Sequence, residues 1–108
     1  MKVVITNATK ADLVEIGEFI RPHSPIRAIT FVDELLDRCA TLADMPRAFP
    51  LVPRYERHRI RRCVHRDYLI FYRVLKESVE VIHILHGARN YDALLFPDES
   101  PNDSSKDE

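Results

Sequence analysis

Arginine side chains dominate the stretch RYERHRIRRCVHRDYLIFYRVL, residues 54–75. Six arginines stand within its first thirteen positions, and an apolar run with two tyrosines follows. A guanidinium binds phosphate or carboxylate through two parallel hydrogen bonds, and beside a tyrosine it can also hold a base by stacking. This chemistry indicates nucleic acid or an acidic protein as a partner. The alternative is that the arginines only solvate a sheet face and cover apolar surface with their stems.

The histidines and cysteines do not indicate a metal site. His83 and His86 are three positions apart on an expected strand, so their side chains should point to opposite faces. Cys39 and Cys63 lack a CxxC spacing and are expected to be reduced, packed side chains. We therefore expect no metal and no cofactor.

The net charge of −1 over 108 residues hides two unlike parts of the chain. Residues 97–108, PDESPNDSSKDE, hold five acids and one lysine, whereas the remainder is mildly basic. We expect one domain at residues 1–96 and a disordered acidic tail at residues 97–108. The tail either solubilises the protein or covers the arginines as an acidic mimic.

No stretch of the sequence has the features of a membrane or export segment. A spanning helix needs about 20 apolar residues, and a signal peptide needs an apolar run of about 7 to 15. The N-terminal apolar run covers only three residues, Val3 to Ile5. We expect a cytoplasmic protein that makes no contact with a membrane.

Two helices are expected in the first half of the chain, after a short strand at residues 2–6. Thr9 and Asp12 have the spacing of a capping box that opens the first helix, and Ser24 followed by Pro25 is typical of the start of the second. Apolar residues recur at helical spacing in both segments, which predicts an antiparallel helical hairpin. The apolar positions are Leu13, Ile16, Gly17 and Ile20, then Ala28, Val32, Leu35, Leu36, Cys39, Leu42 and Ala43.

Three strands are expected in the second half, at RIRRCV, YLIFYRVL and SVEVIHIL. Their short connections predict an antiparallel meander. The fold class is therefore α+β in the order β-α-α-β-β-β, with the helical hairpin on one face of an antiparallel sheet and the other face open to water or a partner. If Tyr68 and Tyr72 face the helices, Arg73 faces the open side.

Four segments together resemble the RelE/ParE superfamily of toxins from bacterial toxin-antitoxin pairs: ADLVEIGEFI, RAITFVDELLDRCATLADMP, RDYLIFYRV and VEVIHILHGARN. The resemblance runs from about Val3 to Leu95, and its most specific pieces are the YLIFYRV strand and the HGAR that closes the last strand. It implies a small toxin whose groove is filled by the C-terminal segment of a cognate antitoxin, in a hetero-oligomeric complex.

Two activities occur in the superfamily. RelE-like members are ribosome-dependent mRNA endoribonucleases, and in this sequence the resemblance implies Arg61, Arg73, His86, Arg89 and Tyr91 as their catalytic residues. ParE-like members inhibit DNA gyrase and need only a recognition surface. Because ALLF stands where the nuclease branch carries its terminal aromatic residue, the sequence favours the ParE branch.

Recognition of a target or of an antitoxin is expected to depend on arginines. The candidates are Arg59, Arg61, Arg62, Arg73 and Arg89. A third hypothesis remains, namely a protein with the toxin fold that has lost its activity and only binds its antitoxin.

Overall fold

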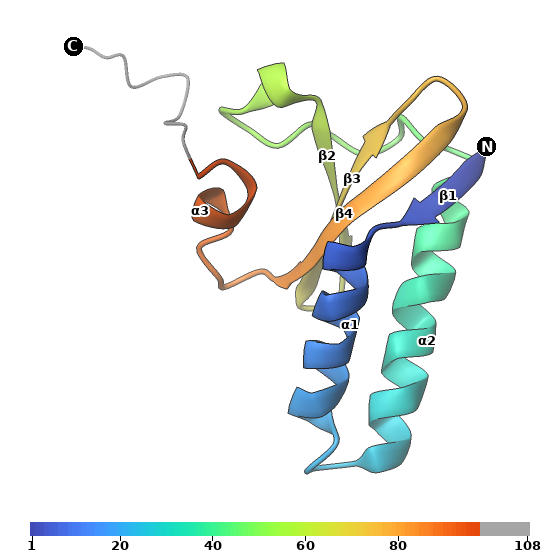
Figure 1. Ribbon diagram of the computed structural model, residues 1–108, viewed down its shortest axis with the longest axis vertical. Helices are drawn as coiled ribbons and strands as arrows, with labels where there is room; N and C mark the ends of the chain where they lie inside the picture. Colours follow the sequence, from blue (N-terminus) through green and yellow to red (C-terminus); the bar gives the residue numbers. More distant parts are fainter. Residues whose placement is uncertain (98–108) are drawn as a thin grey trace.

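The computed structural model describes residues 1–97, and the expected order of elements is confirmed (Figure 1). The elements are β1 (Lys2–Ile5), α1 (Asn7–Ile20), α2 (Pro25–Thr41), the 3-10 helix η1 (Glu56–His58), β2 (Ile60–His65), β3 (Tyr68–Val74), β4 (Ser78–His86) and α3 (Asp92–Leu95). Apart from Pro97, the acidic tail expected at residues 97–108 lies outside the described residues. Within residues 1–97, no helix combines the length and the apolar character needed to cross a bilayer.

The helical hairpin begins one turn earlier than the capping signal indicated. Thr6, not Thr9, is the N-cap of α1, and its hydroxyl oxygen accepts from the backbone N–H of Thr9 at 3.2 Å. The Thr9 hydroxyl instead donates to the carbonyl of Val81 in β4, at 2.8 Å. The cap of α2 is as expected, since Ser24 accepts from the Arg27 N–H and Pro25 occupies the first turn.

The sheet has the strand order β1-β4-β3-β2. Strands β2, β3 and β4 form the expected antiparallel meander, with a β-bulge between Phe71 and Tyr72. The sheet is nevertheless mixed, because β1 pairs with β4 in parallel. A parallel pair needs a long crossover connection, and the helical hairpin with the meander supplies it.

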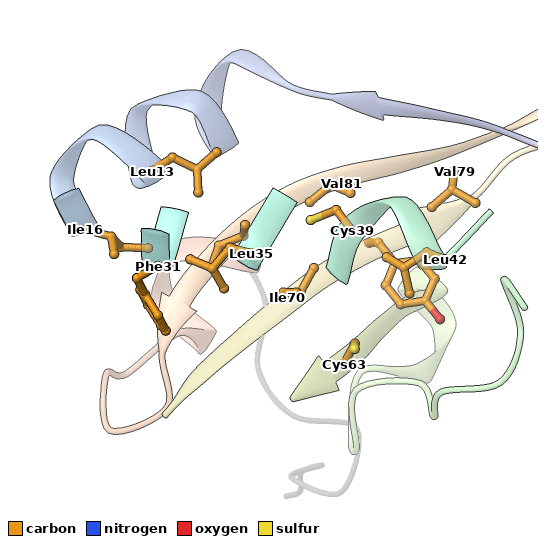
Figure 2. Packing of buried hydrophobic residues seen from close by; sticks show 12 residues of the cluster. Leu13, Ile16, Phe31, Leu35, Cys39, Leu42, Cys63, Ile70, Val79 and Val81 are labelled. Atoms are coloured by element: carbon orange, nitrogen blue, oxygen red, sulfur yellow. The ribbon is translucent and has the colours of Figure 1, made fainter. Parts of the chain in front are cut away.

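The main core lies between the helical hairpin and one face of the sheet. Both tyrosines of β3 are on this face as expected, with Tyr72 fully buried and Tyr68 packed at the margin. Leu13 and Ile16 come from α1, Phe31, Leu35 and Cys39 from α2, and Ile70, Val79 and Val81 from the sheet (Figure 2). Burial of these apolar side chains is the main favourable term that holds the helices on the sheet.

The opposite face of the sheet is not open, which contradicts the expectation. A second cluster covers much of it, built on the loop before η1, on α3 and on Phe96, and Figure 1 shows α3 set apart from the two long helices. Its buried members are Val52, Tyr55, Ile60, Phe71, Leu85 and Phe96. Val64 on β2 remains 56% exposed, so the uncovered part of this face lies toward the β2–β3 turn.

Candidate functional site

An aromatic cleft lies at the end of the sheet where β4 finishes. We define it as two neighbouring cavities, of about 340 and 300 Å3, which share Phe19, Tyr68 and His86 in their walls. Glu15 and Arg89 line the first cavity, and Arg27 and Phe31 line the second. The cleft therefore has an apolar, aromatic lining with an arginine on each side.

Ring contacts hold the cleft in shape. Tyr68 stands edge-on to His86 at 5.2 Å between ring centroids and lies 5.5 Å from Phe31. Burial raises the pKa of Tyr68, with smaller contributions from the neighbouring acids, so its hydroxyl keeps its proton at neutral pH. Phe19 is 70% exposed at the rim. A large apolar side chain left in water at the edge of a hollow is typical of a binding surface.

A charged cluster centred on Glu34 fixes one wall of the cleft. Its carboxylate binds Arg27 at 2.5 Å and lies 3.4 Å from His65 and 3.6 Å from Arg66. The hydrogen bond from Arg27, followed by that from His65, holds the pKa of Glu34 at about 2. The same interaction places the Arg27 guanidinium 5.0 Å above the Phe31 ring.

The other wall is held by contacts that α1 makes with β4 and with the residues that follow it. Arg89 lies 3.6 Å from the Glu15 carboxylate. Asp12 accepts from the backbone N–H of Ile84 at 2.9 Å and lies 2.7 Å from the Nδ1 atom of His83. Asp12 therefore satisfies a backbone donor on the part of β4 that extends beyond β1.

Arg62 and Arg73 lie on the sheet face away from the two long helices. Arg62 donates to the Tyr91 hydroxyl at 2.7 Å, and this contact ties β2 to the segment before α3. Arg73 pairs with Glu80 on the neighbouring strand at 2.8 Å. Arg73 is thus on the expected face, but a carboxylate already occupies its guanidinium.

Arg59 and Arg61 belong to a third environment, at the end of the sheet opposite the aromatic cleft. Arg61 donates to the backbone carbonyl of Phe49 at 2.7 Å and to that of Arg47 at 3.3 Å. Arg59 follows η1 with a φ of 60°. A polar pocket of about 90 Å3 is lined by Arg47, Leu51, Arg59, Arg61 and Val74, and we call it the arginine pocket.

The structure provides no metal-binding cluster among residues 1–97. Cys39 and Cys63 are buried free thiols, and burial raises both pKa values, that of Cys39 to about 12. A thiol with a raised pKa is a poor nucleophile and a poor metal ligand. The cysteines therefore belong to the core, as the sequence indicated.

Comparison with known proteins gives the family. Residues 3–91 match the family described as "ParE toxin of type II toxin-antitoxin system, parDE". The chain belongs to the ParE toxin family. A solved structure titled "Chromosomal ParDE TA system from P. aeruginosa" has the same fold with a TM-score of 0.64 at 18% identity, covering 80% of this chain and 95% of that one. None of the curated proteins matches the sequence.

Membership of the ParE family makes this chain the toxin component of a type II toxin-antitoxin pair, with an antitoxin as its partner. The ParE branch of the RelE/ParE superfamily, which the sequence favoured, is thereby confirmed.

Residues considered for nuclease chemistry are separated in this ParE structure. His86 and Arg89 line the aromatic cleft, and Tyr68 on β3 pairs with His86 across the sheet. Arg73 lies five residues farther along β3, which is roughly 16 Å from Tyr68 at about 3.3 Å per residue. Arg61 is held by backbone carbonyls at the arginine pocket, and Tyr91 binds Arg62. The five candidates do not form one active site.

Sequence reasoning missed Glu15 and Phe19, which line the aromatic cleft beside His86. Phe19 carried a usable signal, because it is a large apolar residue off the buried stripe of α1. Glu15 carried none, since an exposed acid on a helix is ordinary.

Proposed function

We propose that this ParE family toxin inhibits DNA gyrase in the cytoplasm and that a cognate antitoxin neutralises it. The observation that carries the proposal is the family match over residues 3–91, joined to the wide separation of the residues considered for RNA cleavage. A gyrase inhibitor needs a recognition surface and no catalytic set of its own.

The aromatic cleft is the surface that we assign to the antitoxin. Its apolar lining suits a large apolar side chain from a peptide that orders on binding, and Arg27 and Arg89 at its sides suit acidic residues of the same peptide. Bound antitoxin would cover Phe19, which removes a large apolar side chain from water.

Gyrase inhibition is tested by incubating the full chain with gyrase, ATP and supercoiled plasmid and stopping the reaction with denaturant. The expected result is protein-linked linear DNA, which disappears when the antitoxin is added first. A folded chain that yields no linear DNA at any concentration would overturn the proposal. The control is the same reaction without ATP or without gyrase.

The antitoxin assignment is tested with two matched truncations on α1. Phe19→Ala removes the rim of the aromatic cleft, whereas Val14→Ala removes an equally exposed apolar side chain, 65% exposed, from the groove between α1 and α2. We expect Phe19→Ala to weaken antitoxin binding by roughly tenfold or more, as for an interface hot spot, and Val14→Ala by less than about threefold. The reverse order of effects would place the antitoxin in the other groove.

One observation favours a second candidate, the mRNA endoribonuclease. Glu15, Tyr68, His86 and Arg89 line a single cavity, and these side chains supply an acid-base pair, a hydroxyl and a cation for attack of a ribose 2′-hydroxyl on phosphate. This candidate predicts cleavage of translated messages that is lost in His86→Ala and Glu15→Gln. Growth arrest on expression without antitoxin would separate both activities from a protein that only binds its antitoxin.

A further inference from the structure

The arginine pocket has the features of an anion-binding site. Three guanidinium groups, of Arg47, Arg59 and Arg61, line a space of about 90 Å3 whose wall is predominantly polar. Hydrogen bonds to the Phe49 and Arg47 carbonyls fix the position of the Arg61 guanidinium. Guanidinium groups favour a carboxylate or a phosphate oxygen, to which each can donate in parallel pairs.

No carboxylate of residues 1–97 forms an ion pair with these three arginines. The contrast with other arginines is clear, since Arg73 has Glu80, Arg27 has Glu34 and Arg89 has Glu15. Like charges that line one small pocket repel one another, and an anion from elsewhere relieves that repulsion. The pocket is therefore complementary to an acidic group that the folded domain does not supply.

The described part of the chain ends beside His58, the residue that precedes Arg59. Phe96 is buried and stacks on Tyr55 at 4.0 Å between ring centroids, and it lies 4.6 Å from the His58 ring. Arg59 directly follows His58 in the chain. The packing of Phe96 thus fixes the start of the C-terminal segment beside the residues that lead into the arginine pocket.

The sequence beyond Pro97 supplies the acids. Residues 98–108 hold five acids and one lysine, and a segment of this length reaches at most about 40 Å when extended. A connection of this length gives its ends an effective concentration on the order of millimolar. A contact is mostly formed at such a concentration when its dissociation constant lies below about 1 mM, which requires carboxylates that bind several arginines at once rather than a single exposed ion pair.

We propose that carboxylates of the C-terminal segment 98–108 occupy the arginine pocket. The segment then acts as a built-in competitor, which an external anion such as a nucleic-acid phosphate must displace before it can bind Arg47, Arg59 and Arg61. Because the contact is between exposed charges, salt weakens it.

The test keeps the full chain and changes only charge. The segment variant carries Asp103→Asn, Asp107→Asn and Glu108→Gln, and the matched control carries Glu18→Gln, Asp33→Asn and Asp37→Asn, three exposed acids on the long helices. Inorganic phosphate is titrated into each protein while the Nε–Hε resonance of Arg59 is followed by NMR. Loss of the resonance in Arg59→Gln assigns it.

The segment variant is expected to bind phosphate roughly fivefold to tenfold more tightly than the wild type at low salt. The phosphate affinity of the control variant should differ from that of the wild type by less than about twofold. The difference should disappear near 0.5 M salt, where the screening length is only about 4 Å. Equal affinities in all three proteins, or an Arg59 resonance that does not change when the segment is neutralised, would overturn the proposal. No gyrase or antitoxin is present, so this result is independent of the proposed function.

Discussion

Replacement of Phe96 by alanine tests whether the second cluster of the structure contributes to global stability. Phe96 is 4% exposed, and its ring stacks on Tyr55 with an angle of 5° between the ring planes. It is the last buried side chain of the described residues, and it joins α3 to the sheet face that the long helices do not cover.

The expected loss is about 3 kcal/mol of unfolding free energy. Phe→Ala substitutions in cores cost roughly 3 to 5 kcal/mol, and the value should lie at the lower end because the site is near the surface, where neighbouring side chains and water fill part of the space. Loss of the stacked ring pair, worth about 0.5 to 1.5 kcal/mol beyond burial, is included in that figure.

Urea denaturation followed by circular dichroism measures the change. With a slope of roughly 1.5 kcal/mol/M, the midpoint should fall by about 2 M. Phe19→Ala is the matched control, since the same side chain there is 70% exposed and its removal should change stability by less than about 0.5 kcal/mol. A loss below about 1 kcal/mol in Phe96→Ala would refute the reasoning, because it would mean that the C-terminal segment separates from the sheet before the domain unfolds.

Three further predictions concern stability. Gly17→Ala should raise the unfolding free energy by about 0.5 to 1 kcal/mol, because alanine lowers the conformational entropy of the unfolded chain and its Cβ would lie at an ordinary 3.8 Å from Val32. A lower melting temperature in thermal denaturation would contradict this. Tyr72→Phe should lower it by about 1 to 2 kcal/mol, since the buried hydroxyl donates to the Pro46 carbonyl at 2.7 Å, and urea midpoints that match the wild type would disprove it. Because the pKa of Glu34 is lowered, its ionised carboxylate stabilises the fold above pH 4.5, and this stabilisation is lost as the pH falls toward 2. The unfolding free energy of Glu34→Gln should therefore fall less steeply over that range than that of the wild type. Parallel curves of unfolding free energy against pH in the two proteins would exclude this role.

Local patterns were sufficient for the elements of this fold. The alternation in β2 correctly put Arg61 and Arg62 on opposite faces of the sheet. Ser24 with Pro25 marked the start of α2 correctly, because that cap depends on neighbouring residues alone. The predicted apolar face of α2 was slightly displaced, since Phe31 is 5% exposed while Leu36 is 37% exposed.

Features that depend on distant partners could not be predicted. Thr6 and Thr9 are both good caps, and the choice between them is made by Val81, 72 residues from Thr9. The cover on the second sheet face comes from a proline-rich loop and from Phe96, which have no periodic pattern to reveal them. The hydrogen-bond partners of the arginines also depend on the tertiary arrangement, as with Arg73 and Glu80 and with Arg62 and the Tyr91 hydroxyl.

The parallel pairing of β1 with β4 has a consequence for synthesis of the toxin. Lys2 pairs with Ser78, so β1 has no partner until β4 has been translated. At roughly 5 to 20 residues per second, the apolar face of the helical hairpin waits several seconds for the sheet that covers it. Contacts between the two ends of a chain also slow folding, because loop closure precedes the contacts that stabilise it. The sheet of the nascent toxin therefore stays incomplete until β4 has left the ribosome, and the apolar face of the helical hairpin is accessible to other molecules until then.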